Sequence, residues 1–74
     1  MTLRDAKIGA AYIVSSLNLD MVTRRRLEAL GLTRGTVISI LNRSRNGAVI
    51  LMVRGSRLAL GSKIADTIHM KEAS

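Results

Sequence analysis

The sequence predicts a mainly β fold: a small, strongly bent barrel of five strands, with one short α-helix between strands 1 and 2 and a single helical turn before the last strand. Five short segments rich in apolar residues are separated by glycines and turn residues, whereas a single segment has helical spacing. The chain has 74 residues, of which 47% are hydrophobic. We therefore expect one domain, 1–74, with its own aliphatic core.

The first strand is expected over 11–17, where Ala11, Ile13, Ser15 and Leu17 share one face. The helix should follow over 21–30. Asp20 is a suitable N-cap, and Gly31 can take the left-handed conformation after the last turn. On a helical wheel one arc contains Val22, Thr23, Leu27, Ala29 and Leu30, with Arg26 inside it and Arg24, Arg25 and Glu28 opposite. This arc is expected to face the core, with the stem of Arg26 over its edge.

The remaining strands are expected over 36–42, 48–54, 57–60 and 66–71. Ile38 and Ile40 share one face of the second strand, as Ile68 and Met70 do in the last. Asn46-Gly47 should supply the positive φ angles of a hairpin loop over 43–47, and Gly55-Ser56 a second tight turn. One helical turn is expected over 61–65, before the last strand.

Charge and composition restrict the partner and the compartment. Twelve basic residues against five acidic ones give a net charge of +7, which attracts nucleic acid, anionic lipid or an acidic protein face. The chain has no cysteine, its N-terminus lacks a signal-peptide pattern, and its longest apolar run is far shorter than a membrane span. We expect a cytoplasmic protein, with a peripheral position at the inner face of the cytoplasmic membrane left open.

The residues offer no catalytic chemistry and no metal site. His69 is the sole histidine, and the five carboxylates have no ligand spacing. Asp66 and His69 fall on opposite strand faces, and no glycine-rich run precedes a lysine at phosphate-loop spacing. We therefore expect no enzyme activity, no cofactor and no small-molecule substrate.

Three segments of the chain resemble the FeoA family. They are 25–38 (RRLEALGLTRGTVI), 53–60 (VRGSRLAL) and 64–68 (IADTI), with Gly9 and Ile13 before them. The resemblance covers about Leu3 to Lys71 and departs at Gly61, where the family often has a basic residue. It implies an SH3-like barrel that serves as a cytoplasmic accessory of ferrous iron uptake and docks on the cytoplasmic part of the membrane permease FeoB. Transition metal ion binding is implied for the family as a whole and has no ligand set in these residues.

The segment 48–53 is apolar at every position, although a strand packed on one face should alternate. Val49, Leu51 and Val53 are expected to fill the barrel. The other set, Ala48, Ile50 and Met52, is covered either by the N-terminal segment or the helix, or forms an outer surface for self-association or docking. The candidate partner-binding residues are Arg24, Arg25, Arg43, Arg45, Ile50 and Met52.

Nucleic-acid binding is the alternative function. Six arginines could form basic patches, and small barrels of this type also bind RNA. They are Arg24, Arg25, Arg43, Arg45, Arg54 and Arg57. Single-strand recognition usually adds several aromatic stacking platforms, and Tyr12 is the one aromatic residue of the chain. We therefore rank this alternative below protein docking.

Overall fold

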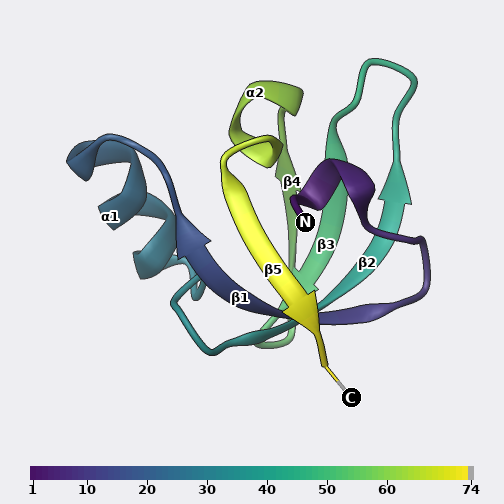
Figure 1. Ribbon diagram of the computed structural model, residues 1–74, viewed down its shortest axis with the longest axis horizontal. Helices are drawn as coiled ribbons and strands as arrows, with labels where there is room; N and C mark the ends of the chain where they lie inside the picture. Colours follow the sequence, from purple (N-terminus) through teal and green to yellow (C-terminus); the bar gives the residue numbers. More distant parts are fainter. Residues whose placement is uncertain (74) are drawn as a thin grey trace.

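The computed structural model describes residues 1–73 and shows five strands with little helix (Figure 1). The elements in chain order are the 3-10 helix η1 (Leu3–Asp5), β1 (Ala11–Leu17), α1 (Met21–Ala29), β2 (Val37–Arg43), β3 (Val49–Val53), β4 (Ser56–Leu60), α2 (Ser62–Ala65) and β5 (Ile68–Glu72). The predicted mainly β fold, with its helix and its single helical turn in the predicted places, is confirmed. The short η1 was not predicted.

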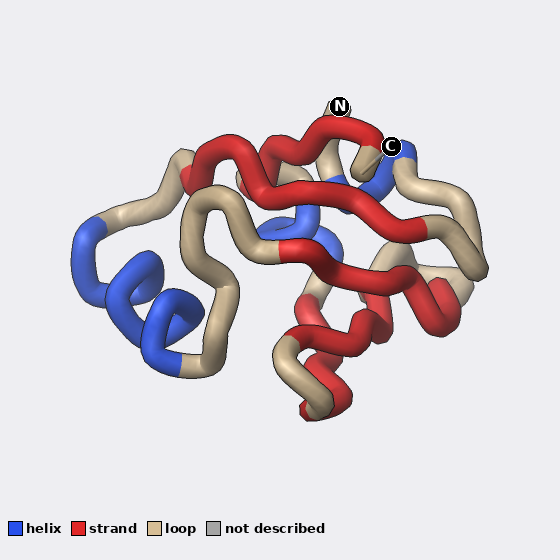
Figure 2. Tube along the Cα trace, turned by 90° about the horizontal axis from the view of Figure 1, so that it is seen from below, coloured by secondary structure: helices blue, strands red, loops and turns tan. Residues whose placement is uncertain are grey.

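The five strands form one antiparallel sheet in the order β4-β3-β2-β1-β5. The sheet bends strongly around a single core, and β4 and β5 are its two edges (Figures 1 and 2). The N-terminal segment covers part of the β5 edge, because Thr2 bridges to His69 and the Met70 N–H donates to the Met1 carbonyl at 2.9 Å. The predicted barrel is therefore a strongly curled sheet whose edge strands β4 and β5 are not paired with each other.

The core is aliphatic apart from one tyrosine. Its members are Leu3, Ala6, Tyr12, Val14, Leu17, Leu27, Leu32, Ile38, Ile40, Val49, Leu51, Val53, Leu60, Ala65, Ile68 and Met70. The predicted inward pairs of β2 and β5 and the inward set of β3 all belong to it. Neither of the two α-helices in 1–73 is long and apolar enough to span a bilayer.

In the first part of β1 the core receives the side chains that alternate with the face of Ala11, Ile13 and Ser15. Tyr12 and Val14 are buried, and Ile13 is half-exposed. An irregularity in the pairing with β5 lies between Val14 and Ser16 and shifts the alternation, so that Leu17 also points inward. Alternation within seven residues cannot reveal such a shift.

The predicted apolar arc of α1 does not face the core. The N-cap is as expected, since the Thr23 N–H donates to the Asp20 carboxylate at 3.1 Å, and Gly31 has a φ of 106°. Leu27 is the only buried residue of the helix. Val22 and Leu30, predicted to be inward, are 63% and 54% exposed. Ala29 and Arg26 are exposed as well, because α1 lies beside the sheet and not across it (Figures 1 and 2).

The turns differ in detail from the expectation. In the β2–β3 loop only Gly47 has a positive φ, 88°, so Asn46 does not share that role. The β3–β4 turn is centred on Arg54 and Gly55, whose φ angles are 50° and 80°, one position earlier than Gly55-Ser56. Two successive positive φ angles match the right-handed twist of a tight hairpin.

Candidate docking surfaces

The outward side of β3 is apolar. On this strand the half-buried Ile50 and Met52 alternate with the three buried residues. Met52 lies opposite Ser39 on β2 and Arg57 on β4, and Ile50 lies opposite Ala59 on β4. No acidic side chain belongs to these rows. We call this set of Ser39, Ile50, Met52, Arg57 and Ala59 the outer sheet face.

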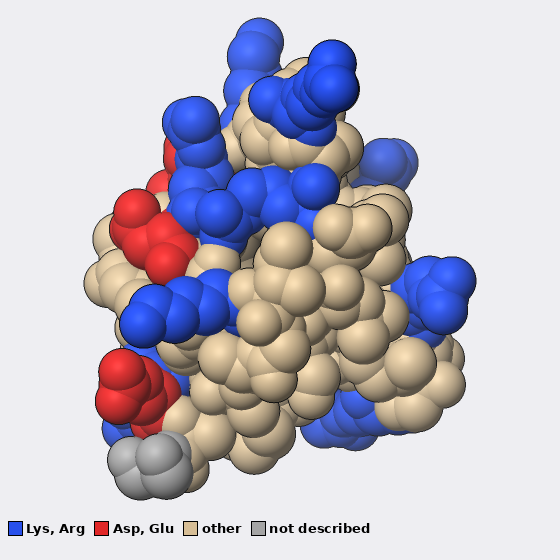
Figure 3. All heavy atoms as spheres, turned by 90° about the vertical axis from the view of Figure 1, so that its right-hand side faces the viewer, with Lys and Arg blue, Asp and Glu red and all other residues tan. Residues whose placement is uncertain are grey.

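Ile50 and Met52 are half-buried, and neither is among the exposed large hydrophobic residues of 1–73. The helix η1 packs against α2 and β5, and α1 lies at the other side of the molecule. Neither residue is fully buried. On the side where β2 runs, Figure 3 shows a broad surface of uncharged residues bordered by Lys and Arg, with the acidic side chains gathered at one edge. The arrangement suits contact with a partner that is apolar at its centre and acidic at its rim.

Arg43 is the last residue of β2, and Arg45 lies in the β2–β3 loop that follows it. The loop is fixed by the Ser44 N–H, which donates to the Ala48 carbonyl at 2.9 Å, and by the Gly47 N–H, which donates to the Ser44 carbonyl at 3.1 Å. Arg43 also donates from Nη2 to the Ala6 carbonyl, so its guanidinium holds the N-terminal segment. Arg45 is exposed in the loop and is the more available of the two for a partner.

The predicted Arg24 and Arg25 lie away from these groups, on α1, at the opposite side of the molecule from the β2–β3 loop (Figure 1). The six predicted residues therefore form two separate surfaces. Arg24 helps to line a polar hollow of about 290 Å³ between β1 and α1, together with Arg34 and Glu28. The walls also include two serines and Asn18. Positively and negatively charged side chains both line this hollow, so its lining does not favour a ligand of one charge.

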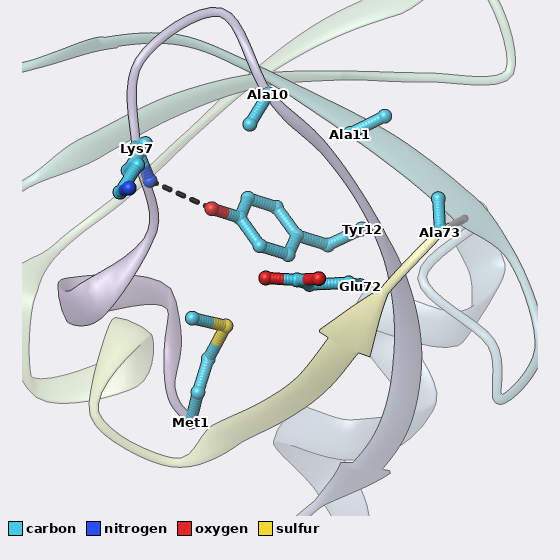
Figure 4. A pocket seen from close by; sticks show the side chains of 7 residues that line it. All are labelled: Met1, Lys7, Ala10, Ala11, Tyr12, Glu72 and Ala73. Atoms are coloured by element: carbon cyan, nitrogen blue, oxygen red, sulfur yellow. Dashed lines mark hydrogen bonds between the residues drawn. The ribbon is translucent and has the colours of Figure 1, made fainter.

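A second hollow, of about 380 Å³, lies where the chain ends meet (Figure 4). Its walls include Met1, Lys7, Ala10 and Glu72, with Tyr12 at the base. The Lys7 N–H donates to the Tyr12 hydroxyl at 2.9 Å, and the ring is 3% exposed. The sole aromatic residue is thus committed to the core and cannot stack on a base.

Titratable residues are scattered over the described part of the chain. No three His, Asp or Glu side chains of residues 1–73 gather as a metal ligand set would require. One ion pair is formed there, between Arg4 and Asp66 at 3.2 Å, and it joins η1 to the end of α2 on the surface. The Thr23 backbone N–H lowers the pKa of Asp20 below its ordinary value of 3.8, and this effect belongs to the helix cap.

Sequence reasoning missed several exposed residues that the fold places next to the predicted ones. Val37 is 55% exposed and lies opposite Ile13 on β1, which in turn lies opposite Lys71 on β5. Arg57 lies opposite Met52. The cross-strand register brings these residues to one side of the sheet. The alternation of Ile38 and Ile40 was the only signal in the sequence that could have placed Val37 outward.

The chain matches the family model of the FeoA domain over residues 1–72. It is 31% identical over 68 residues to a curated protein of Methanocaldococcus jannaschii that is described as Fe(2+) transport protein A. The alignment covers 92% of this chain and 82% of that protein. The solution structure of FeoA from Chlorobium tepidum superposes with a TM-score of 0.92 at 28% identity, over 100% of this chain and 71% of that one.

Two further structures show how widely the fold is used. One is FeoA from Stenotrophomonas maltophilia complexed with zinc, which is described as a procaryotic SH3 domain protein. It superposes with a TM-score of 0.81 at 22% identity, over 96% of this chain and 89% of that chain. The apo form of the manganese-activated repressor ScaR matches 97% of this chain with only 35% of its own, at 27% identity and a TM-score of 0.85. The predicted SH3-like fold and the predicted resemblance are thus confirmed, and the chain belongs to the FeoA domain family, a family of ferrous iron transport.

Proposed function

We propose that this protein is a non-enzymatic accessory of ferrous iron uptake that docks on the cytoplasmic part of the FeoB permease. Membership of a ferrous iron transport family supports the iron-uptake part of the proposal. The observation that carries the docking part is the outer sheet face. There, the half-buried Ile50 and Met52 lie on the outward side of β3, opposite its three core residues. Met52 lies between the polar residues Ser39 of β2 and Arg57 of β4.

The docking surface combines an apolar centre with a basic border. Ile50 and Met52 supply the apolar contact, and the flexible thioether of Met52 adapts to a partner's shape. Arg57 lies opposite Met52, and Arg45 is exposed in the loop that leads into β3, and both charges favour an acidic rim on the partner. Arg43 lies opposite the buried Val49, so its side chain leaves the sheet on the inward side, where it holds the N-terminal segment and does not belong to the outer sheet face. In this proposal the protein is cytoplasmic and peripheral to the membrane, where the permease lies.

Docking is tested by measuring binding to the purified cytoplasmic domain of the permease. Ile50→Ser with Met52→Ser should weaken binding by at least tenfold, because two apolar contacts of about 1 kcal/mol each would be lost. Ile8→Ser is the matched control, since Ile8 is 59% exposed in the turn before β1. Equal binding by the double variant and the wild type would contradict the assigned surface.

The charged border has its own test. Arg45→Gln should slow association and reduce its salt dependence, because a rim charge acts mainly on the encounter rate. Lys63→Gln, which removes the same charge from exposed α2, is the control. If both substitutions slow association equally, the net charge of the protein alone determines the association rate, and Arg45 is not part of the docking surface.

The cellular role is tested by a clean deletion. Loss of this protein should impair Fe(II) uptake, and complementation by the wild type, but not by the Ile50→Ser, Met52→Ser variant, should restore it. Normal uptake in the deletion strain would contradict the proposal. If a second copy of this chain binds the outer sheet face instead, the wild type should be a dimer and the same double variant a monomer.

The nucleic-acid alternative receives less support from the geometry. Tyr12 is buried, so the basic surface has no aromatic platform for bases. Attraction to phosphates alone would weaken steeply with salt. Saturable RNA binding that persists at physiological salt, without any binding to the permease domain, would favour the alternative.

A further inference from the structure

Helix α1 exposes large apolar side chains on its solvent side. Met21, Val22 and Leu30 are 56%, 63% and 54% exposed, although they belong to or follow the helix that Leu27 anchors to the core. They are three of the seven large hydrophobic side chains exposed in residues 1–73. A single buried residue leaves most of the helix surface free, so this side is available for another contact.

The charges of the helix are distributed around the same side. Successive residues are 100° apart on an α-helix, which places Arg25 and Arg26 between Met21, Val22 and Leu30 and away from Leu27. Glu28, the one acidic residue of α1, is half-buried and turned with Arg24 toward the polar hollow beside β1. The solvent side of α1 therefore carries apolar and cationic groups with no acidic group among them.

This composition suits an anionic lipid surface better than a protein. The five residues of this side line none of the described hollows, so they form no pocket that could receive a partner's side chain. By contrast, short apolar groups flanked by long arginine stems insert shallowly between headgroups while their guanidinium groups contact phosphates.

We propose that the solvent side of α1, formed by Met21, Val22, Arg25, Arg26 and Leu30, binds the surface of anionic phospholipid bilayers. Each arginine contributes attraction to the negative leaflet, and each apolar side chain leaves water for the acyl boundary. The contact is weak and reversible, because one short helix provides it. It deepens the peripheral location proposed above, but uses a different side of the protein from the outer sheet face.

Binding to vesicles tests the proposal directly. The full chain is mixed with vesicles of phosphatidylcholine alone, or of phosphatidylcholine with an equimolar amount of phosphatidylglycerol, and the bound fraction is measured by flotation over a salt series. Binding is expected only to the anionic vesicles and should fall as salt rises. Arg25→Gln with Arg26→Gln should lower the partition coefficient on the order of 30-fold, because each basic residue near the surface contributes about fivefold.

Two matched controls separate this surface from charge and hydrophobicity in general. Arg45→Gln with Lys63→Gln removes two exposed charges elsewhere and should lower binding much less than the α1 pair. Val22→Ser should lower binding about fivefold, whereas Ile8→Ser, of similar exposure, should not. Glutamine is a good helix former, so far-ultraviolet circular dichroism should show the helix intact in the arginine variant.

Several results would overturn the proposal. They are equal binding to neutral and anionic vesicles, equal losses for the two pairs of charge variants, or no binding to either vesicle. Binding of the α1 arginine variant to the permease domain, measured without lipid, should equal that of the wild type. A loss there with vesicle binding unchanged would identify α1 as a protein interface. Failure of permease binding alone contradicts the docking proposal and leaves the lipid contact standing.

Discussion

At the residue scale, two features require a glycine at position 31: the φ angle of its backbone and the closeness of neighbouring side chains. Its φ of 106° places it in the region that side chains disfavour, directly after α1. An added Cβ would lie 3.0 Å from Cδ of Arg54 and 3.3 Å from Cγ2 of Val53. Gly31 thus lets the β3–β4 turn approach the end of the helix closely.

We predict that Gly31→Ala destabilises the protein by about 1–3 kcal/mol, because it adds a crowded Cβ to an unfavourable φ. Gly35→Ala is the matched control, since Gly35 has a φ of 89° and an added Cβ there would meet no heavy atom within 4 Å. It should cost about 1 kcal/mol, from the backbone alone. Urea unfolding of both variants gives the difference, and equal losses would show that contact with Arg54 and Val53 is unimportant.

At the element scale, α1 depends on its first turn more than on burial. Leu27 is its only buried residue, and the Asp20 carboxylate accepts the Thr23 N–H. That hydrogen bond lowers the pKa of Asp20 in the folded protein. A carboxyl group with a lowered folded-state pKa stabilises the fold above its unfolded pKa of about 4 and loses this effect as the pH falls through the folded value.

We therefore predict that acidification below about pH 4 frays α1 in the wild type. Asp20→Asn should keep a cap while removing this titration, because asparagine caps helices about as well as aspartate. Asp20→Ala should weaken the helix at every pH. Helical circular dichroism or hydrogen exchange at the amide of Thr23 measures both effects, and a pH response in Asp20→Asn equal to the wild type would refute the assignment.

At the scale of the whole molecule, one core has to stabilise the sheet and the N-terminal segment together. Leu51 lies on β3, at 0% exposure, and Leu3 of η1 is equally buried. The fold has no disulfide, and no second cluster of buried residues occurs in the described part of the chain. We expect a single cooperative unfolding transition, with a free energy of unfolding of about 4–11 kcal/mol.

Leu51→Ala should lower this free energy by about 2–5 kcal/mol, from lost burial and the cavity left behind. For a protein of this size such a loss approaches complete unfolding. Leu41→Ala, at a residue 36% exposed in the bulged part of β2, should cost less than about 1 kcal/mol. Denaturant unfolding of both variants is the measurement, and similar losses would mean that the core is not centred on β3.

The strand and turn elements were predictable because local patterns specify them. Alternation predicted the inward placement of Ile38 and Ile40, and Asp20 and Gly31 marked the two ends of the helix. The side of α1 that faces the core was predicted wrongly. A helical wheel identifies an apolar arc, but it cannot tell whether the helix lies across a sheet or beside it.

The sequence alone determined the family, the order of the elements and the inward residues of β2 and β5, because spacing, caps and alternation are properties of neighbouring residues. Only the tertiary structure decided which surfaces remain free. The register across strands sets Met52 beside Arg57, and the bend of the sheet leaves α1 at one side with Val22 and Leu30 in solvent. Contacts between distant segments depend on how the whole sheet curls around its core, and no local pattern in the chain encodes that.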